Sequence, residues 1–198
     1  MYVKKANQSE ATRKRLEEVA RKLFAERGFS DVSGEELVAE AQVTRGALYH
    51  HYDGKDGLFE AVVENAMREV QEKIAAQADG ARDPLRALQQ GIAAFLTLST
   101  QADLQRILLI DAPAVLGWPK WRAMDGRHGF GLMRNALAAA VKGGLLRGHD
   151  PDMLAHLLQG AVIEAAMVIA RADDPPRARK AAERAIGAII DGWRATPA

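Results

Sequence analysis

Apolar residues recur every three or four positions along most of the chain. Leu16, Val19 and Leu23 have this spacing within residues 9–27, and the same spacing continues through residues 58–74. A period of about 3.6 residues is typical of amphipathic α-helices, whereas half-buried strands alternate every second residue. No segment shows a sustained two-residue alternation. The pattern therefore predicts an all-α protein with about nine helices.

Asp-Pro pairs mark the starts of three of these helices. They stand at positions 83–84, 150–151 and 174–175, each directly before an apolar periodic run. Asp is a favoured N-cap, and Pro is tolerated at the first helical position because its missing N–H would be unpaired there. Between the first two of these helices, the pattern predicts a short helix around 104–110 and a longer one over 119–142.

Two short helices are expected between residues 33 and 52. Ser33 and Glu36 have the spacing of a capping box, which opens the first of them, and Thr44 can cap the second. The second helix runs to about Tyr52. Two short helices joined by a turn of about three residues form a helix-turn-helix, whose second helix enters the major groove of DNA.

The second helix has two chemically different faces. Leu48 and Tyr52 lie four residues apart and are expected to face the core, while Arg45 and Tyr49 share another face. Arg can donate to two acceptors on guanine, and Tyr can donate to phosphate or pack on a thymine methyl. Gly46 would let backbone approach DNA closely. Thr44, His51 and Lys55 are expected beside phosphates. For Tyr49, plain core packing is the alternative.

Charge and composition limit the classes of function that this sequence can have. The net charge is +1, but residues 1–28 contain eight basic and four acidic residues, next to the helix-turn-helix. A solvated helix face is the alternative explanation of this excess.

The absence of Cys excludes disulfides and thiolate metal sites, and the adjacent His50 and His51 lack the four-residue spacing of a helical metal pair. We expect no metal, no cofactor and, without a secretory signal, a cytoplasmic location.

The segment 153–170 has only one formally charged residue, Glu164. A helix that is apolar on nearly all sides is usually buried, and a domain of this size can hardly enclose it alone. We therefore expect this helix and the one after 174–175 to pair with their twofold mates in a four-helix bundle. A buried helix in a monomer is the alternative. His156, Gln159 and Glu164 argue against a membrane span.

A small-molecule pocket is expected around the segment DAPAVLGWPKW, at 111–121. Aromatic and Met side chains with a few polar groups suit an apolar or amphipathic effector, although core packing explains any single residue equally well. Glu164 could orient a ligand, hydrogen-bond across the dimer or reach solvent. The predicted lining residues are Phe95, Leu108, Trp118, Trp121, Phe130, Met133, Arg134, Leu137 and Glu164.

Residues 9–63, with Gly28-Phe29 and the stretch VTRGALYHHYDGKDGLFEAVV, resemble the DNA-binding domain of the TetR family of bacterial transcriptional regulators. The resemblance implies an all-α homodimer with a DNA-binding domain at 1–54 and a ligand-binding and dimerisation domain at 55–198. Gln42, where the family commonly has Gly, and Gly34, where a larger residue usually stands, depart from the pattern. The DNA-contacting set implied by position is Ser33, Thr44, Arg45, Gly46, Tyr49, His51 and Lys55.

The resulting hypothesis is a ligand-responsive regulator, by family expectation a repressor, that binds a palindromic double-stranded DNA operator and is released by its effector. The long helix over 58–74 would transmit the change. Two alternatives stay open: a DNA-binding architectural or activator protein without a ligand, and a helical carrier of apolar molecules that has lost DNA binding. No catalytic triad, phosphate loop or metal spacing indicates an enzyme.

Overall fold

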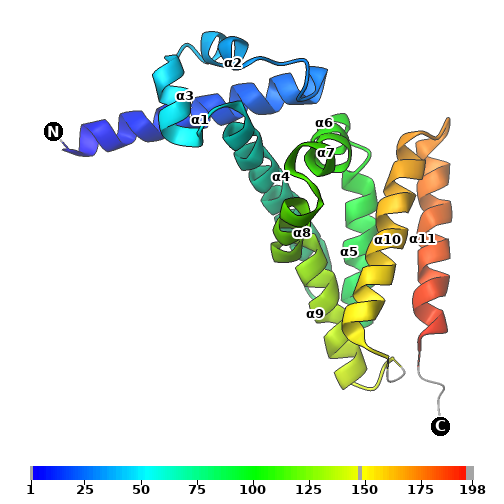
Figure 1. Ribbon diagram of the computed structural model, residues 1–198. Coiled ribbons are helices and arrows are strands. Elements are labelled where there is room, and N and C mark those ends of the chain that lie inside the picture. The colour runs from blue at the N-terminus through cyan, green and yellow to red at the C-terminus, as the bar shows by residue number, and fades with distance from the viewer. Residues whose placement is uncertain (1, 147–148, 195–198) are drawn as a thin grey trace. The chain divides into compact units, whose positions relative to one another are not determined.

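The computed structural model describes residues 2–146 and 149–194, and these are helical throughout, apart from turns and an isolated bridge between Leu146 and Arg194 (Figure 1). The all-α prediction is confirmed. The helices are α1 (Tyr2–Arg27), α2 (Gly34–Glu40), α3 (Arg45–Tyr52), α4 (Lys55–Ala78), α5 (Pro84–Leu98), α6 (Ala102–Leu104), the π-helix η1 (Gln105–Asp111), α7 (Ala112–Leu116), α8 (Trp118–Arg127), α9 (Gly129–Lys142), α10 (Pro151–Ala170) and α11 (Pro175–Gly192).

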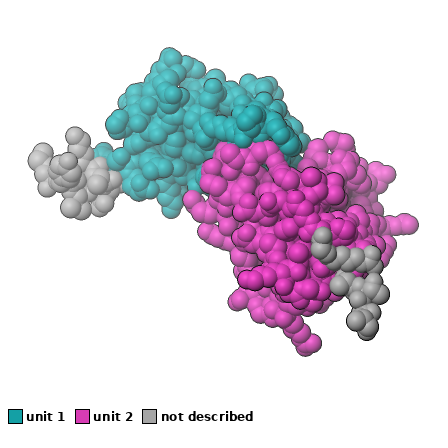
Figure 2. All heavy atoms as spheres, turned by 60° about the horizontal axis from the view of Figure 1, so that its bottom comes forward, with its two compact units in different colours: residues 1–66, 102–121 teal, residues 67–101, 122–198 magenta. Residues whose placement is uncertain are grey.

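The chain forms two compact units, shown in teal and magenta in Figure 2. Unit 1 contains residues 1–66 and 102–121, and unit 2 contains residues 67–101 and 122–198. Helices α4 and α8 each contribute residues to both units. Unit 1 is therefore assembled from two segments that are separated in sequence by the whole of α5.

The core of unit 1 is built around three phenylalanines. The ring centroids of Phe24 and Phe59 lie 5.2 Å apart in an edge-to-face arrangement, and Phe29 lies 4.9 Å from Phe59. The edge-to-face arrangement of Phe24 and Phe59 is a favoured geometry for aromatic pairs. Helix α3 is fixed by the Tyr52 hydroxyl, which donates to Glu17 Oε1 at 2.6 Å. Helix α3 is thus attached to α1 through its buried face.

In unit 2, helices α5, α9, α10 and α11 pack against one another. All three predicted Asp N-caps are confirmed: Asp83, Asp150 and Asp174 each accept a hydrogen bond from a backbone N–H of the helix that follows. Among the described residues, α10 alone is long and apolar enough to cross a membrane, a test that core helices of soluble proteins also pass.

Three boundaries differ from the sequence-based expectation. Helix α1 begins at Tyr2 rather than near Ser9. The expected helix over 119–142 is divided at His128, whose φ of −116° and ψ of −113° are not helical. The single short helix expected around 104–110 is replaced by the three consecutive elements α6, η1 and α7. The division at His128 matters most, because this residue is buried and its ring contacts Gln71.

Candidate nucleic-acid interface

Helices α2 and α3 form the predicted helix-turn-helix, and their caps are those expected from the sequence. Ser33 and Glu36 make both hydrogen bonds of the capping box. The Thr44 hydroxyl accepts from Ala47 N at 3.2 Å at the start of α3. In the turn, Gln42 has a φ of +53°, the left-handed conformation that favours glycine. The motif therefore forms with a strained non-glycine residue at its turn.

The two faces of α3 separate as predicted. Leu48 and Tyr52 are buried, with exposed fractions of 1% and 8%. Tyr49 is 52% exposed, and the Arg45 guanidinium carbon lies 5.5 Å from the centroid of its ring. Gly46, also exposed, leaves the backbone of the first turn uncovered. The exposed face of α3 thus presents a guanidinium stacked beside a phenol ring.

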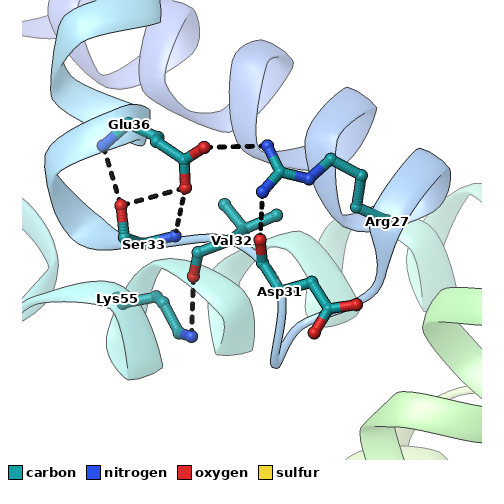
Figure 3. A network of polar contacts seen from close by, with 6 residues as sticks. All are labelled: Arg27, Asp31, Val32, Ser33, Glu36 and Lys55. Atoms are coloured by element: carbon teal, nitrogen blue, oxygen red, sulfur yellow. Dashed lines mark hydrogen bonds and ion pairs between the residues drawn. The ribbon is translucent and has the colours of Figure 1, made fainter.

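A polar network holds the connection between α1 and α2 (Figure 3). Arg27 of α1 donates to Glu36 Oε1 at 2.9 Å and to the carbonyl oxygen of Asp31. The Arg27 hydrogen bond, followed by those from the Ser33 N–H and hydroxyl, lowers the pKa of Glu36 to about 2. Glu36 is therefore ionised at neutral pH and joins the two helices through its two oxygens.

Lys55 supports the same connection from α4. Its Nζ donates to the carbonyl oxygens of Phe29 at 2.9 Å and Val32 at 2.8 Å, and lies 3.9 Å from the centre of the Phe29 ring. Since an ammonium group has three N–H donors, these bonds leave one donor for a phosphate. Lys55 thus has a structural role that the sequence did not reveal.

His51 is half-buried beside α1. Burial, then the charges of His50 and Arg13, lower the pKa of His51. The ring is therefore mostly neutral at pH 7, and any contact with phosphate would use a neutral N–H donor.

Glu35 is a residue of this surface that sequence reasoning missed. Its Oε1 lies 3.4 Å from Nη1 of Arg45, across the turn of the motif. The two residues are ten positions apart on different helices, so no helical spacing indicates the pair. Glu35 places a carboxylate on a surface expected to face DNA phosphates.

A second missed feature is a clamp formed by η1 on the end of α1. Asp111 Oδ2 accepts from Phe29 N at 2.8 Å and from Arg106 Nε at 3.2 Å. Arg106 Nη2 lies 3.4 Å from the carbonyl oxygen of Arg27 and is so close to Gly28 that a β-carbon there would lie 1.9 Å away. π-Helical segments are often found at functional sites. The segment 102–111 thus holds the end of α1 by side-chain and backbone contacts.

Unit 2 contains a cluster of buried and half-buried polar groups around Asp125. Its Oδ2 accepts from Arg122 Nη1 at 3.1 Å and from Gln159 Nε2 at 2.9 Å. Nearby in sequence, His128 Nδ1 lies 2.5 Å from Gln71 Oε1. Burial raises the pKa of Asp125 to about 6, although the positive charge of Arg122 opposes this shift. Buried polar groups cost stability unless they are bonded, so such a cluster is a candidate site for the polar part of a ligand.

An aromatic wall borders this cluster. The rings of Phe130 and His156 lie 4.9 Å apart, and the Arg122 guanidinium carbon lies 4.7 Å from the Phe130 centroid. Arg122 Nη2 also donates to His156 Nδ1 at 2.9 Å, which assigns the proton of a neutral His156 to Nε2. Asp125 and His128, which the sequence analysis did not include in any site, are therefore both engaged in polar contacts within unit 2.

The residues expected to line a pocket are not brought together in one unit. Leu108, Trp118 and Trp121 belong to unit 1, whereas the remaining six belong to unit 2. Trp118 and Glu164 are exposed, as is Arg134, which lies 3.9 Å from Asp152. Phe95 and Phe130 are half-buried, and the buried members of the set are Leu108, Trp121, Met133 and Leu137.

The outer side of α10 carries an exposed stripe. Gly160 and Glu164 lie on it, together with three large apolar side chains that are each more than half exposed. The opposite side of the helix is buried in unit 2. Gln159 lies on that buried side, so its amide bonds within the unit rather than reaching solvent. The apolar members of the α10 stripe are Met153, Leu157 and Val168.

A helix-turn-helix with an exposed Arg–Tyr face defines a DNA-binding protein of the helix-turn-helix class. Two family models match the chain. Residues 17–62 match "Bacterial regulatory proteins, tetR family", and residues 85–193 match "Tetracyclin repressor-like, C-terminal domain". The chain belongs to the TetR family of bacterial transcriptional regulators. The family match identifies a DNA-binding regulator rather than an enzyme.

Individual relatives agree with this assignment. The Transposon Tn10 TetC protein of Escherichia coli is 26% identical over 141 residues, which are 71% of each chain. A TetR-family regulator from Pectobacterium atrosepticum is 36% identical, with a TM-score of 0.78 over 97% of this chain and 98% of that one. The structure of a SmeT–triclosan complex is 27% identical, with a TM-score of 0.66 over 90% and 91%.

Proposed function

We propose that this regulator is a repressor that binds a palindromic operator as a homodimer and is released by a small effector. Residues 1–54 would supply DNA binding, and residues 55–198 effector binding and dimerisation. The observation that carries the proposal is the exposed Arg45–Tyr49 face of α3, held in place by buried Leu48 and Tyr52. The likeness to a tetracycline-repressor C-terminal domain supports repression. Such a protein works in the cytoplasm.

On DNA, Arg45 would donate to O6 and N7 of a guanine, and Tyr49 would contact a phosphate or a thymine methyl. Gly46 would allow the backbone to approach the groove closely. The remaining members of the predicted set would contact phosphates at its edges: Ser33, Thr44, His51 and Lys55.

The homodimer is supported by the α10 stripe. Contiguous apolar side chains such as Leu157 are rarely left exposed along a whole helix. Pairing of α10 and α11 with their twofold mates would cover the stripe in a four-helix bundle. Dimerisation would also place two recognition helices about 34–36 Å apart, the spacing of successive major grooves. Leu157→Glu should give a monomer in light scattering, whereas Ala139→Glu, at an exposed position of α9, should not.

The effector is proposed to be amphipathic. Its apolar part would lie against Phe95, Met133 and Leu137 of unit 2, and its polar group would bond within the cluster around Asp125. The complex of SmeT with triclosan supports a small-molecule ligand in a related fold. A part for Leu108, Trp118 and Trp121, or for the exposed Arg134 and Glu164, stays a prediction.

Effector and operator would weaken each other by favouring different conformations. Helix α4 has residues in both units. The segment 102–121 belongs to unit 1. The helices before and after it in sequence, α5 and α9, belong to unit 2. Both connections could carry the change. Coupling of about 1–3 kcal/mol is typical of such systems and is reciprocal between the two ligands.

The test is to titrate the protein into labelled DNA from the region upstream of its own gene. Binding is monitored by fluorescence anisotropy over a range of salt concentrations. Arg45→Ala should weaken operator binding by about 5- to 150-fold, equivalent to a lost bidentate contact of about 1–3 kcal/mol. Lys22→Ala, an exposed cation of α1 outside α3, is the matched control and should change the affinity only slightly. Equal binding to operator and scrambled DNA would reject a specific regulator.

A further inference from the structure

The carboxylate of Glu35 and the guanidinium of Arg45 form an ion pair across the helix-turn-helix turn. Oε1 and Nη1 are 3.4 Å apart, and the two side chains are 71% and 69% exposed. The guanidinium carbon also lies 5.5 Å from the centre of the Tyr49 ring. Arg45 therefore contacts two side chains of the same surface in the structure without DNA.

Glu35 takes no part in the capping box at the start of α2. The capping bonds to Ser33 are made by Glu36, which also pairs with Arg27. Gly34 has no side chain. Glu35 and Glu36 both lie in the first turn of α2, where acidic side chains interact favourably with the helix dipole. Glu35 differs from Glu36 in that its ion-pair partner is on α3.

The pair limits what Arg45 can bind. Glu35 occupies one amino group of the guanidinium, and the Tyr49 ring lies over its face, so the remaining N–H donors can still reach the two acceptors of guanine. A phosphate approaching Arg45 would also meet the Glu35 carboxylate, and like charges brought together at an interface cost binding free energy. An exposed ion pair contributes less than about 1 kcal/mol by itself, so guanine can displace it partly without a large penalty.

We propose that Glu35 is a specificity-determining residue of the DNA-binding surface: it directs Arg45 to guanine and opposes sequence-independent binding of Arg45 to phosphate. The inference rests on the proposed function. Discrimination between partners often depends on such a repulsive element in addition to the attractive contact. Glu35 acts here through Arg45 and makes no base contact of its own.

The experiment starts with selection of a preferred duplex from random DNA by the parent protein. Affinities for this duplex and for a scrambled one are then measured for the parent, Glu35→Gln and Glu40→Gln at one salt concentration. Glu40 is an exposed acid at the other end of α2, so its variant removes the same charge away from Arg45. We expect Glu35→Gln to bind scrambled DNA about 3- to 10-fold more tightly while the affinity for selected DNA changes less than about twofold. Glu40→Gln should shift both affinities by the same factor.

A second comparison tests the dependence on Arg45. In an Arg45→Ala background, Glu35→Gln should no longer change the ratio of the two affinities. The inference is overturned if Glu35→Gln changes both affinities by the same factor, as Glu40→Gln should. It is also overturned if Glu35→Gln lowers the ratio of selected-DNA to scrambled-DNA affinity as much in the Arg45→Ala background as in the parent. If the parent selects no sequence at all, the proposed function fails instead. Circular dichroism of each variant confirms that the helices are intact.

Discussion

The carbonyl oxygen of Tyr52 lies only 1.5 Å from the position that a β-carbon on residue 57 would occupy, so residue 57 must be glycine in this conformation. Tyr52 ends α3 and Gly57 lies in the first turn of α4. The exposed face of α3 is thus positioned through a backbone contact that no side chain could tolerate.

Gly57→Ala should strongly destabilise the protein, by about 1–3 kcal/mol or more, because the backbone must shift to relieve the overlap. The measurement is urea-induced unfolding followed by circular dichroism. Gly126→Ala is the control: a β-carbon there meets no atom of the described residues within 4 Å, and helix propensity makes the change neutral or slightly stabilising. Equal stability of the two variants would contradict the overlap.

Gln42→Gly should stabilise the protein by up to about 1 kcal/mol, because the residue has a φ of +53° and glycine adopts such a conformation without steric cost. The midpoint of thermal unfolding should rise accordingly. Gln8→Gly, within helix α1, should do the opposite, since glycine weakens a helix interior. A destabilised Gln42→Gly protein would show that the side chain contributes more than the turn conformation costs.

Asp111→Ala should destabilise the protein by about 1–3 kcal/mol, because it leaves the N–H of Phe29 without its acceptor and Arg106 without its ion-pair partner. The hydrogen-exchange rate of the Phe29 amide should rise, and the free energy obtained from that rate should fall by the same amount. Asp103→Ala is the comparison, because Asp103 forms a more exposed ion pair with Arg21 of α1. That variant should lose less than about 1 kcal/mol.

The pKa of Asp125 predicts a pH dependence of stability. Its value is raised from 3.8 to about 6 in the folded protein, mainly by burial. The folded state therefore binds this proton more tightly than the unfolded state, and the resulting stabilisation is lost as pH rises from about 4 through 6. In Asp125→Asn this loss is absent.

The check is thermal unfolding of parent and variant from about pH 4 to pH 8. The difference in midpoint, variant minus parent, should rise through this window and become constant above it. Asp152→Asn, at an exposed carboxyl near the start of α10, is the charge-matched comparison. A constant difference between parent and Asp125→Asn across the whole range would show that Asp125 does not titrate there.

Features that depend on short-range rules were predictable from the sequence. The opposite burial of Tyr52 and Tyr49 follows from helical spacing, and the Asp N-caps follow from the Asp-Pro pairs. Gln42, which departs from the family's usual Gly, has a positive φ, the backbone conformation that favours glycine.

What was missed depends on contacts between distant residues. Asp125 meets Gln159 34 positions later, and Phe29 meets Asp111 82 positions later. No periodicity connects such pairs. The division at His128 did leave a local signal, because glycines stand at 126, 129 and 131, where an uninterrupted helix would favour other residues.

The composition of unit 1 from residues 1–66 and 102–121 limits how this protein can be dissected. A fragment that stopped after residue 66 would retain the whole helix-turn-helix but lose Asp111, the acceptor of the Phe29 N–H, and the buried Ile107 and Ala112. Such a fragment would expose apolar surface and an unbonded amide at the end of α1. The helix-turn-helix part of this chain is therefore not expected to fold stably without the segment 102–121. We expect an engineered fusion that uses residues 1–66 to need the segment 102–121 as well.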